Sequence, residues 1–273
     1  FNIAGGVEAG GNYTIPLKAV DGFDNQDYRW VPPQAHSNDS PFAEGIGCGF
    51  CHADYHDAWA DSKHAQAAKD PYVLDLYTGT GGRGTVTSQG PGWLVDNPTE
   101  AGPCANCHAP TAALAAPNAT RLDQVSGAHL NGVFCESCHK VRDVGNVEAT
   151  PVTGAFQYWR PQNGVLMAFG PLDDACDEHH MGPMSYQPDM KQSRFCAGCH
   201  QWTSDNGVKV MDTYGEWAIS RYAELGIQCQ DCHMRPLDHD EPAMPLPPLP
   251  EGFEPGDPYC ILRSPVGERG QMD

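Results

Sequence analysis

The chain has 273 residues, and its 16 basic and 35 acidic side chains give a net charge of −19. Such an acidic surface disfavours nucleic acids and anionic lipids as partners. No apolar run reaches the roughly 18 residues that a transmembrane helix needs, so no membrane span is predicted. No leader with a charged and an apolar region opens the chain, so Phe1 is expected to follow a removed signal peptide.

Residues 1–44 are rich in Gly, Asn, Asp and Pro and carry only short β-like patches, such as 12–15. This composition predicts an extended N-terminal arm instead of a domain. His36 lies in this arm, 12 residues before the first cysteine of the chain.

A Cys-x-x-Cys-His pattern follows the arm and occurs five times. It is the attachment signature of a c-type haem: the two thiols add to the vinyl groups of the porphyrin, and the histidine takes one axial position on the iron. The attachment residues are Cys48, Cys51 and His52; Cys104, Cys107 and His108; Cys135, Cys138 and His139; Cys196, Cys199 and His200; and Cys229, Cys232 and His233. The sequence therefore predicts five haems c, each with its iron.

Two other uses of paired cysteines fit the pattern less well. Structural zinc sites combine Cys-x-x-Cys pairs into tetrahedral sets, which predicts an even number of pairs and no histidine fixed after each one. A thioredoxin-like redox motif is a single pair beside a βαβ unit. The chain has five pairs, each followed directly by histidine, so covalent haem is the favoured interpretation.

The first motif is expected to open a helix from Cys48 to about Lys69. That helix should end before Asp70-Pro71, because proline disfavours a helical conformation in the residue before it. The Gly-rich stretch 78–92 is expected to be a connector, since it lacks the Gly-x-x-x-x-Gly-Lys-Ser/Thr pattern of a phosphate-binding loop.

The spacing of the motifs alternates between short and long. The second and third begin 31 residues apart and the fourth and fifth 33 apart, whereas the other separations are 56 and 61. This faint repeat predicts two similar haem pairs, formed by haems two and three and by haems four and five.

Further elements are expected in the second half of the chain. Residues 155–159 and 165–169 resemble two short strands of a hairpin around the turn 161–164. A helix from Thr213 to Leu225 should end at Gly226, just before the fifth motif. The Pro-rich end of the chain is expected to be an extended tail.

The predicted fold is mostly coil with short α-helices and minimal β, organised around five stacked haems. With 30 Gly, 24 Pro and only 40% hydrophobic residues, the porphyrins must supply much of the core. The expected organisation is an arm at 1–44, a pentahaem cytochrome domain at 45–240, and a Pro-rich tail at 241–273.

Two of the 12 cysteines lie outside the motifs, Cys176 and Cys260. Haem c is attached after export, in a compartment where disulfides persist, so a disulfide between them is expected instead of two free thiols. The same reasoning predicts a secreted, extracellular or periplasmic protein. The acidic residues 173, 174, 177 and 178 are a candidate Ca²⁺ site, although a solvated acidic loop is the simpler interpretation.

Seven histidines remain for the second axial position of five irons, so bis-histidine ligation throughout is possible, which suits electron transfer. The expected distal ligands are His64, His129, His239 and one of the adjacent pair His179 and His180. His56, four residues after His52, is expected to lie outside this set. The fifth ligand would then be His36, from an arm that folds back on its own subunit or reaches the next one.

Parts of the sequence resemble the multihaem c-type cytochromes related to the tetrahaem cytochrome of ammonia oxidisers. The resemblance covers about residues 45–240. It rests on the run from Cys51 through Trp59 to His64, on Gly132–His139, on Ser193–Gln201, and on Tyr214–Trp217 with Gln228–Met234.

The resemblance implies haems stacked in parallel or meeting perpendicularly, and a distal histidine at the position of His64. Some members of this superfamily are enzymes, and others are extracellular polymeric cytochromes in which a histidine of one protomer ligates a haem of the next. Unlike pentahaem nitrite reductases, this chain has no lysine in place of a motif histidine. It also has fewer haem motifs than hydroxylamine oxidoreductases, and both differences count against catalysis.

Two functions remain open at this point. The first is electron transfer through bis-histidine haems to redox partner proteins or an extracellular acceptor, with a head-to-tail homopolymeric filament as one form of it. The second is an oxidoreductase that acts on a small nitrogen or sulfur oxyanion at one five-coordinate haem. His179 or His180 with Arg160 or Arg194 would be the distal groups of such an enzyme.

Overall fold

The computed structural model describes residues 23–80, 90–145, 147, 155–162, 167–171, 184–204 and 206–234. In these residues short helices and coil predominate, with a few short strands, as the sequence predicted. The predictions for residues 1–22, for the tail after 240, for the Cys176–Cys260 disulfide and for the acidic loop at 173–178 concern residues outside these ranges.

The helices are η1 (Ala43–Gly45), α1 (Cys48–Cys51), α2 (Ala53–Ala60), α3 (Lys63–Gln66), α4 (Pro71–Thr78), α5 (Trp93–Asp96), α6 (Cys104–His108), α7 (Pro110–Ala113), η2 (Leu122–Gln124), η3 (Gly127–Asn131), α8 (Cys135–His139), η4 (Pro188–Lys191), α10 (Ser193–His200), α11 (Thr213–Ala218), α12 (Arg221–Glu224) and α13 (Cys229–His233). None of the described helices is long and apolar enough to cross a membrane.

The described strands form three two-stranded sheets. β1 (Val141–Val144) pairs antiparallel with β2 (Phe156–Tyr158), β3 (Ala168–Gly170) pairs parallel with β4 (Met184–Tyr186), and β5 (Trp202–Thr203) pairs antiparallel with β6 (Lys209–Met211). The predicted hairpin is therefore wrong in its pairing. Its two strands exist as β2 and β3, but each pairs with a segment outside the expected turn.

The predicted helix from Cys48 to Lys69 is divided into α1, α2 and α3. His52 leaves the helical region, with φ −121° and ψ 54°, so the first motif ends one helix and the next begins after it. Ser62 then starts α3, because its hydroxyl accepts a hydrogen bond from the backbone N–H of Ala65. The predicted end before Pro71 is confirmed, and Pro71 begins α4.

The predicted helix from Thr213 to Leu225 is likewise divided, into α11 and α12. Ser220 causes the break, since its extended backbone and its hydroxyl cap the N-terminus of α12. Gly226 ends this region with φ +73°, a left-handed conformation that glycine adopts without strain.

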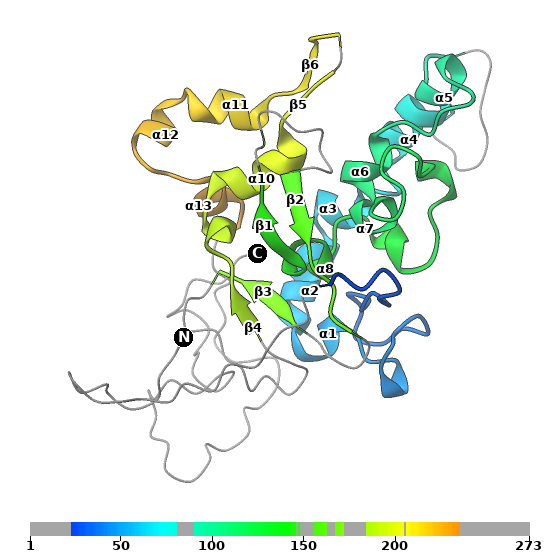
Figure 1. Cartoon of the computed structure of the whole chain (residues 1–273), viewed down its shortest axis with the longest axis vertical. Helices are drawn as coiled ribbons and strands as arrows, with labels where there is room; N and C mark the ends of the chain where they lie inside the picture. The colour runs from blue at the N-terminus through cyan, green and yellow to red at the C-terminus, as the bar shows by residue number, and fades with distance from the viewer. Residues whose placement is uncertain are drawn as a thin grey trace.

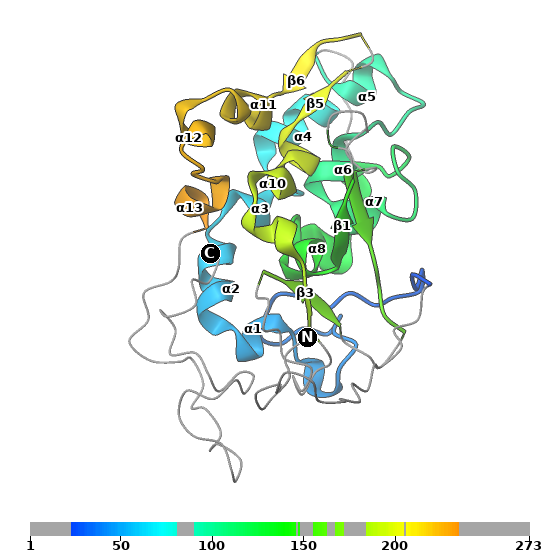
Figure 2. The same ribbon diagram turned by 60° about the vertical axis from the view of Figure 1, so that its left-hand side comes forward.

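The buried apolar side chains form several small clusters. One joins α4, α5, α6 and α7 around Leu74, Tyr77 and Leu122. Another packs β1 and β2 against α10 around Val141, Met190 and Phe195. In Figure 1 α6 and α7 lie on one side of the β1–β2 sheet, and α12 and α13 lie on the other; Figure 2 again shows α12 and α13 away from α6 and α7. Two of the helices that carry the haem motifs, α6 and α13, thus flank this sheet.

The described part of the arm, residues 23–44, is docked on the rest of the chain. Tyr28, Trp30 and Val31 are buried, and the first two pack with Phe134. Arg160 donates two hydrogen bonds to the Asp24 carboxylate, at 2.9 and 2.6 Å. The described part of the arm therefore packs against its own chain, while the role of His36 in this subunit or the next stays a prediction.

Candidate functional site

Each of the five motifs folds into one helical turn, as α1, α6, α8, the end of α10, and α13. Since an α-helix has 3.6 residues per turn, cysteines three positions apart lie on the same face, with the histidine beside them. All ten motif cysteines are free thiols in the structure. Every motif therefore presents two thiols and an imidazole together, as thioether attachment of a porphyrin requires.

The second, third and fourth motifs, here called the inner motifs, bury the two residues between their cysteines. These residues are Ala105, Asn106, Glu136, Ser137, Ala197 and Gly198. The cysteines and histidines of the same motifs are only half-buried. The back of each turn is thus packed in protein, while the face with the thiols and the imidazole stays accessible.

The first and fifth motifs, here called the outer motifs, are more open. Phe50, between the cysteines of the first motif, is 42% exposed, and His52 is exposed. In the fifth motif Cys232 and His233 are exposed. The second cysteine or the histidine of each outer motif therefore faces outward.

Contacts between thiols show which motifs are neighbours in space. The Cys48 thiol of the first motif lies close enough to the Cys135 thiol of the third for each to shift the pKa of the other. The thiols of Cys107 in the second motif and Cys199 in the fourth lie together in the same way, and so do those of Cys196 in the fourth and Cys229 in the fifth.

These contacts correct the pairing that motif spacing predicted. The fourth and fifth motifs are neighbours, as the spacing predicted. The second motif, however, lies against the fourth, and the third motif lies against the first. The close sequence spacing of the second and third motifs instead follows from the short connection through α7, η2 and η3.

Two motif histidines have their protonation pattern fixed by a backbone carbonyl. His108 Nδ1 lies 3.2 Å from the carbonyl oxygen of Ala67, and His139 Nδ1 lies 2.7 Å from that of Phe169. A carbonyl oxygen only accepts, so Nδ1 carries the proton and donates. Nε2 is then left with its lone pair, which is the arrangement of a metal-ligating histidine.

Burial lowers the pKa of the histidines in the three inner motifs. It lowers the pKa of His139, and the same effect lowers the pKa of His108, in each case against an opposing carbonyl hydrogen bond. Burial also lowers the pKa of His200, and the nearby His233 lowers it further. Because iron binds the unprotonated imidazole, these shifts favour ligation at neutral pH.

His64 faces the histidine of the fourth motif. The ring centroids of His64 and His200 are 6.1 Å apart, with an angle of 63° between the rings. A metal ion bound at about 2.0–2.1 Å by a nitrogen of each ring separates the centroids by about 6 Å. Burial, and then the charge of His200, lowers the pKa of His64. The pair thus fits two axial ligands of one iron.

Comparison with protein families agrees with this geometry. Residues 47–140, which contain the first three motifs, match the family model described as cytochrome c554 and c-prime. This segment is a cytochrome c554 domain. The family is one of multihaem c-type cytochromes, which implies haem c and electron transfer. Searches of curated proteins and of solved structures found no match.

The cytochrome c554 domain continues structurally into the fourth motif, beyond the matched residues. His64 lies within the domain and meets His200, and Cys107 of the domain contacts Cys199. Motifs four and five therefore extend the same array. Among the described residues, no group of three or more His, Cys, Asp or Glu is arranged to hold a metal ion.

The other candidate distal histidines are placed less decisively. His129 Nδ1 lies 2.8 Å from the hydroxyl of Thr111, which places it beside α7 and the second motif. His56 is half-buried, and its Nδ1 lies 3.0 Å from the Asp57 carboxylate. His179, His180 and His239 lie outside the described residues. The whole distal set, His64 included, stays a prediction.

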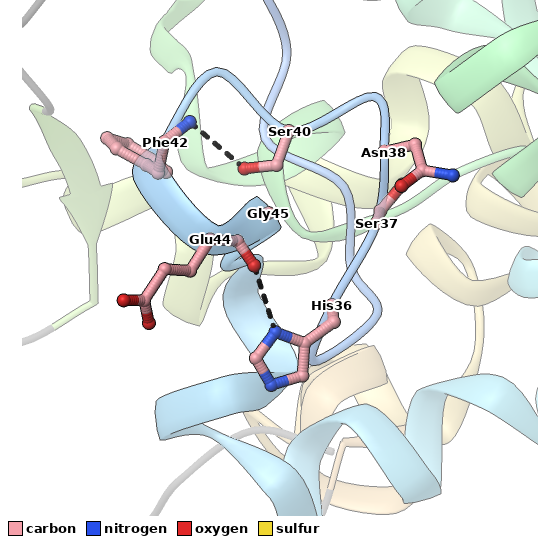
Figure 3. A pocket seen from close by; sticks show the side chains of 7 residues that line it. All are labelled: His36, Ser37, Asn38, Ser40, Phe42, Glu44 and Gly45. Atoms are coloured by element: carbon pink, nitrogen blue, oxygen red, sulfur yellow. Dashed lines mark hydrogen bonds between the residues drawn. The ribbon is translucent and has the colours of Figure 1, made fainter.

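His36 projects from a tight turn of the arm, which Figure 3 shows with the residues around it. The turn is closed by a bridge between His36 and Ile46 and by a 2.7 Å hydrogen bond from Ser37 N to the Gly45 carbonyl. His36 Nδ1 lies 3.3 Å from the carbonyl of Glu44, and the other ring nitrogen points away from it (Figure 3). The open hollow of about 420 Å³ in this turn is formed by residues 36–45 alone.

One residue at the centre of the array carries no signal in the sequence. Tyr158 is half-buried in β2 and donates a 2.9 Å hydrogen bond to the Ser137 carbonyl. Burial raises the pKa of this phenol, and so do the thiols of Cys199, Cys138 and Cys107. Tyr158 thus lies where the three inner motifs meet, a position that only the folded chain reveals.

The two arginines considered for an enzyme site are engaged elsewhere. Arg160 is buried and paired with Asp24 at 2.6 Å. Arg194 donates to the carbonyls of Val144 and Gly145, at 2.7 and 2.6 Å, and pairs with Asp189 at 3.2 Å. Both guanidinium groups hold the fold together and do not point to an oxyanion site.

Proposed function

We propose that the chain transfers electrons through five covalently bound bis-histidine haems c. The proximity of the motif cysteines carries this proposal. Thiol contacts join the first motif to the third, and the second and fifth motifs to the fourth. The third and fourth motifs have no such contact, but Cys138 of the third lies near enough to influence the pKa of Cys196 and Cys199 of the fourth. Neither outer motif is enclosed, so electrons would enter at one outer haem and leave at the other.

The repeated placement of thiols and imidazoles supports the haem number. In every motif both cysteines lie on one helical turn with the histidine directly after them, and the rings of His64 and His200 are separated by a distance that one iron could bridge. Bis-histidine ligation leaves no open position for a substrate, so it suits an electron carrier. An oxidoreductase finds no support in the described residues, since Arg160 and Arg194 are occupied by structural contacts.

Intact mass and spectra of the purified protein test this proposal. We expect the mass of five haems on the chain and a fully low-spin ferric spectrum. In His64→Ala, one haem should become high-spin while the mass still shows five. Fewer than five haems, or a substantial high-spin fraction in the unaltered protein, would contradict the proposal.

We further propose that the protein works outside the cell membrane and assembles head to tail, with His36 as a ligand to a haem of the next copy. His36 is exposed, and its Nδ1 faces a carbonyl, so its outward nitrogen keeps a free lone pair. The closed turn around it holds the ring in one place instead of on a loose chain.

Negative-stain imaging of His36→Ala tests the assembly. We expect the unaltered protein to form filaments, and the variant to lose them and gain one high-spin haem. His56→Ala is the matched control, because His56 is engaged with Asp57 and should leave assembly unchanged. Dispersed monomers of the unaltered protein at every salt concentration and pH would exclude the filament, without affecting the proposal of electron transfer.

A further inference from the structure

A buried pair of opposite charges lies within and directly after the third motif. Glu136, between the two cysteines of that motif, is 6% exposed, and Lys140, which follows the motif histidine, is 2% exposed. The Lys140 ammonium lies 3.2 Å from Glu136 Oε1 and donates a 2.5 Å hydrogen bond to the Met167 carbonyl. The α8 turn itself brings the two side chains together, since they are four residues apart.

The arm completes this pair. The Tyr28 hydroxyl donates to Glu136 Oε1 at 2.7 Å, and the Val31 N–H donates to Oε2 at 2.6 Å. The ammonium of Lys140 also lies 5.1 Å from the centre of the Tyr28 ring. Both oxygens of the carboxylate therefore have donors, and the charges are held in fixed positions without direct access to water.

Stability alone does not account for a charged pair in this position. Moving two charges out of water costs several kcal/mol per ion, and the replacement of a buried ion pair by apolar residues is often neutral or stabilising. An uncharged acceptor in place of Glu136 could take the same hydrogen bonds from Tyr28 and Val31 without burying a charge. What full charges add is a stronger electric field, above all in a buried environment of low dielectric constant.

That field reaches two of the motifs. The contact with Cys135 and burial raise the pKa of the Cys48 thiol; the charge of Glu136 adds to the increase, and that of Lys140 opposes it. Burial lowers the pKa of His139, and Lys140 lowers it further. The attachment points of the first and third haems thus both lie within range of the pair.

We propose that the Glu136–Lys140 pair, completed by Tyr28 of the arm, sets the reduction potential of the third haem. This inference rests on the proposed haem function. The carboxylate favours the more positive, ferric state of the iron, whereas the ammonium favours the ferrous state. Tyr28 and Val31 fix the balance by neutralising part of the carboxylate charge. Tyr28 is a positioning residue here, because it acts on the iron only through Glu136.

Substitutions that remove one charge at a time test the inference. A redox titration followed by electron paramagnetic resonance should show one haem with a higher midpoint potential in Glu136→Gln and the same haem with a lower one in Lys140→Met. We expect each change to alter the reduction equilibrium of that haem about tenfold, which is about 59 mV for a one-electron couple. The double variant should return towards the original value.

Two further variants complete the experiment. Tyr28→Phe keeps the ring but removes the hydroxyl that donates to Glu136. It should therefore lower the midpoint potential of the same haem, by less than Lys140→Met does. Because both buried charges remain, this variant still tests the inference if the other two fold poorly. Glu224→Gln is the matched control, because Glu224 pairs with Arg221 on the exposed helix α12, where both side chains are more than half exposed.

Three outcomes would overturn the inference. These are unchanged midpoints in Glu136→Gln and Lys140→Met, shifts of the same sign in both, and an unchanged midpoint in Tyr28→Phe if the other variants cannot be made. Shifts of equal sign would indicate loosening of the arm and not the effect of charge. A protein without covalent haem would instead contradict the proposed function, so the two failures are distinguishable.

Discussion

The inner and outer motifs differ in how they meet solvent. Each inner motif packs the residues between its cysteines into the protein, whereas each outer motif turns a histidine outward. Yet both outer motifs direct their first cysteine inward, Cys48 to Cys135 and Cys229 to Cys196. The same five-residue pattern therefore gives enclosed sites and open sites, and the surrounding chain decides which.

This contrast suggests a different role for each kind of motif. The inner motifs are packed on the side opposite their thiols, as expected for haems that must stay at a fixed distance from one another. Each outer motif contacts its neighbour through its first cysteine and leaves its histidine exposed. Variants in the two regions should therefore differ in the size of their effects.

The largest loss of stability is expected where the arm is anchored over the first and third motifs. In Asp24→Ala, Arg160 keeps its charge in a buried position without a partner, so the free energy of unfolding should fall by about 3 kcal/mol. Chemical denaturation measures this change. The control Asp57→Ala removes an exposed carboxylate and should change stability by less than about 0.5 kcal/mol. Equal effects of both variants would mean that the arm does not secure the array.

A smaller loss is expected from an added methyl group in an inner motif. A Cβ at Gly198 would overlap the ring of Phe156, so Gly198→Ala forces β2 away from the fourth motif. Overpacking of this kind costs about 1–3 kcal/mol. Thermal unfolding of the haem-loaded protein measures it.

The comparison is made with Phe50→Ala, at the corresponding place between the cysteines of the first motif. Phe50 is 42% exposed, so its removal should have a much smaller effect than the change at Gly198. The distinction between inner and outer motifs would break down if Phe50→Ala were the more damaging of the two.

The anchor of the arm should also weaken in acid. Burial acts to raise the pKa of Asp24, but the hydrogen bonds and charge of Arg160 outweigh it, and the pKa lies below the usual value of 3.8. A carboxylate with a lowered folded-state pKa adds stability above pH 3.8, and this stability is lost as the pH falls through the lowered value.

The unaltered protein and Asp24→Asn should therefore differ in Tm at neutral pH and converge as the pH falls below 3.8. Their Tm values, followed from neutral to acid pH, give the measurement. A Tm difference that stays constant with pH would show that Asp24 does not titrate with the anchor.

The smallest effect is expected on the open side of the fifth motif. Arg221 pairs with Glu224 at 2.6 Å, but 74% and 62% of these side chains are exposed. Exposed pairs of this kind contribute about 0.2–1 kcal/mol, so Arg221→Ala should lower Tm only slightly. A loss as large as that of Asp24→Ala would show that α12 is as constrained as the inner motifs.

The sequence predicted what depends on local patterns. The five motifs, the short helices, the end before Pro71 and the role of Gly226 all follow from residues close together in the chain. Helix breaks at His52 and Ser220 were missed, because helical periodicity continues across them while a local backbone turn or a serine cap interrupts the helix.

Features that depend on distant contacts could not be predicted in the same way. β2 pairs with β1 instead of β3, because the burial of Tyr158 and Phe156 against α10 outweighs the short turn. The contact of Cys107 with Cys199 and the position of Tyr158 likewise depend on the whole fold. The sequence predicts His64 as a ligand to the iron of another motif, but only the structure places its ring beside that of His200.

The interleaved order of the motifs has a consequence for how the chain can be divided. The first joins the third, and the second joins the fourth, so any cut between Cys107 and Cys135 separates both contacts. A cut between the third and fourth motifs separates Cys107 from Cys199 and His64 from His200. Neither of these cuts leaves a fragment in which the first four motifs keep their neighbours, and a ribosome must finish the fourth motif before the second has its neighbour.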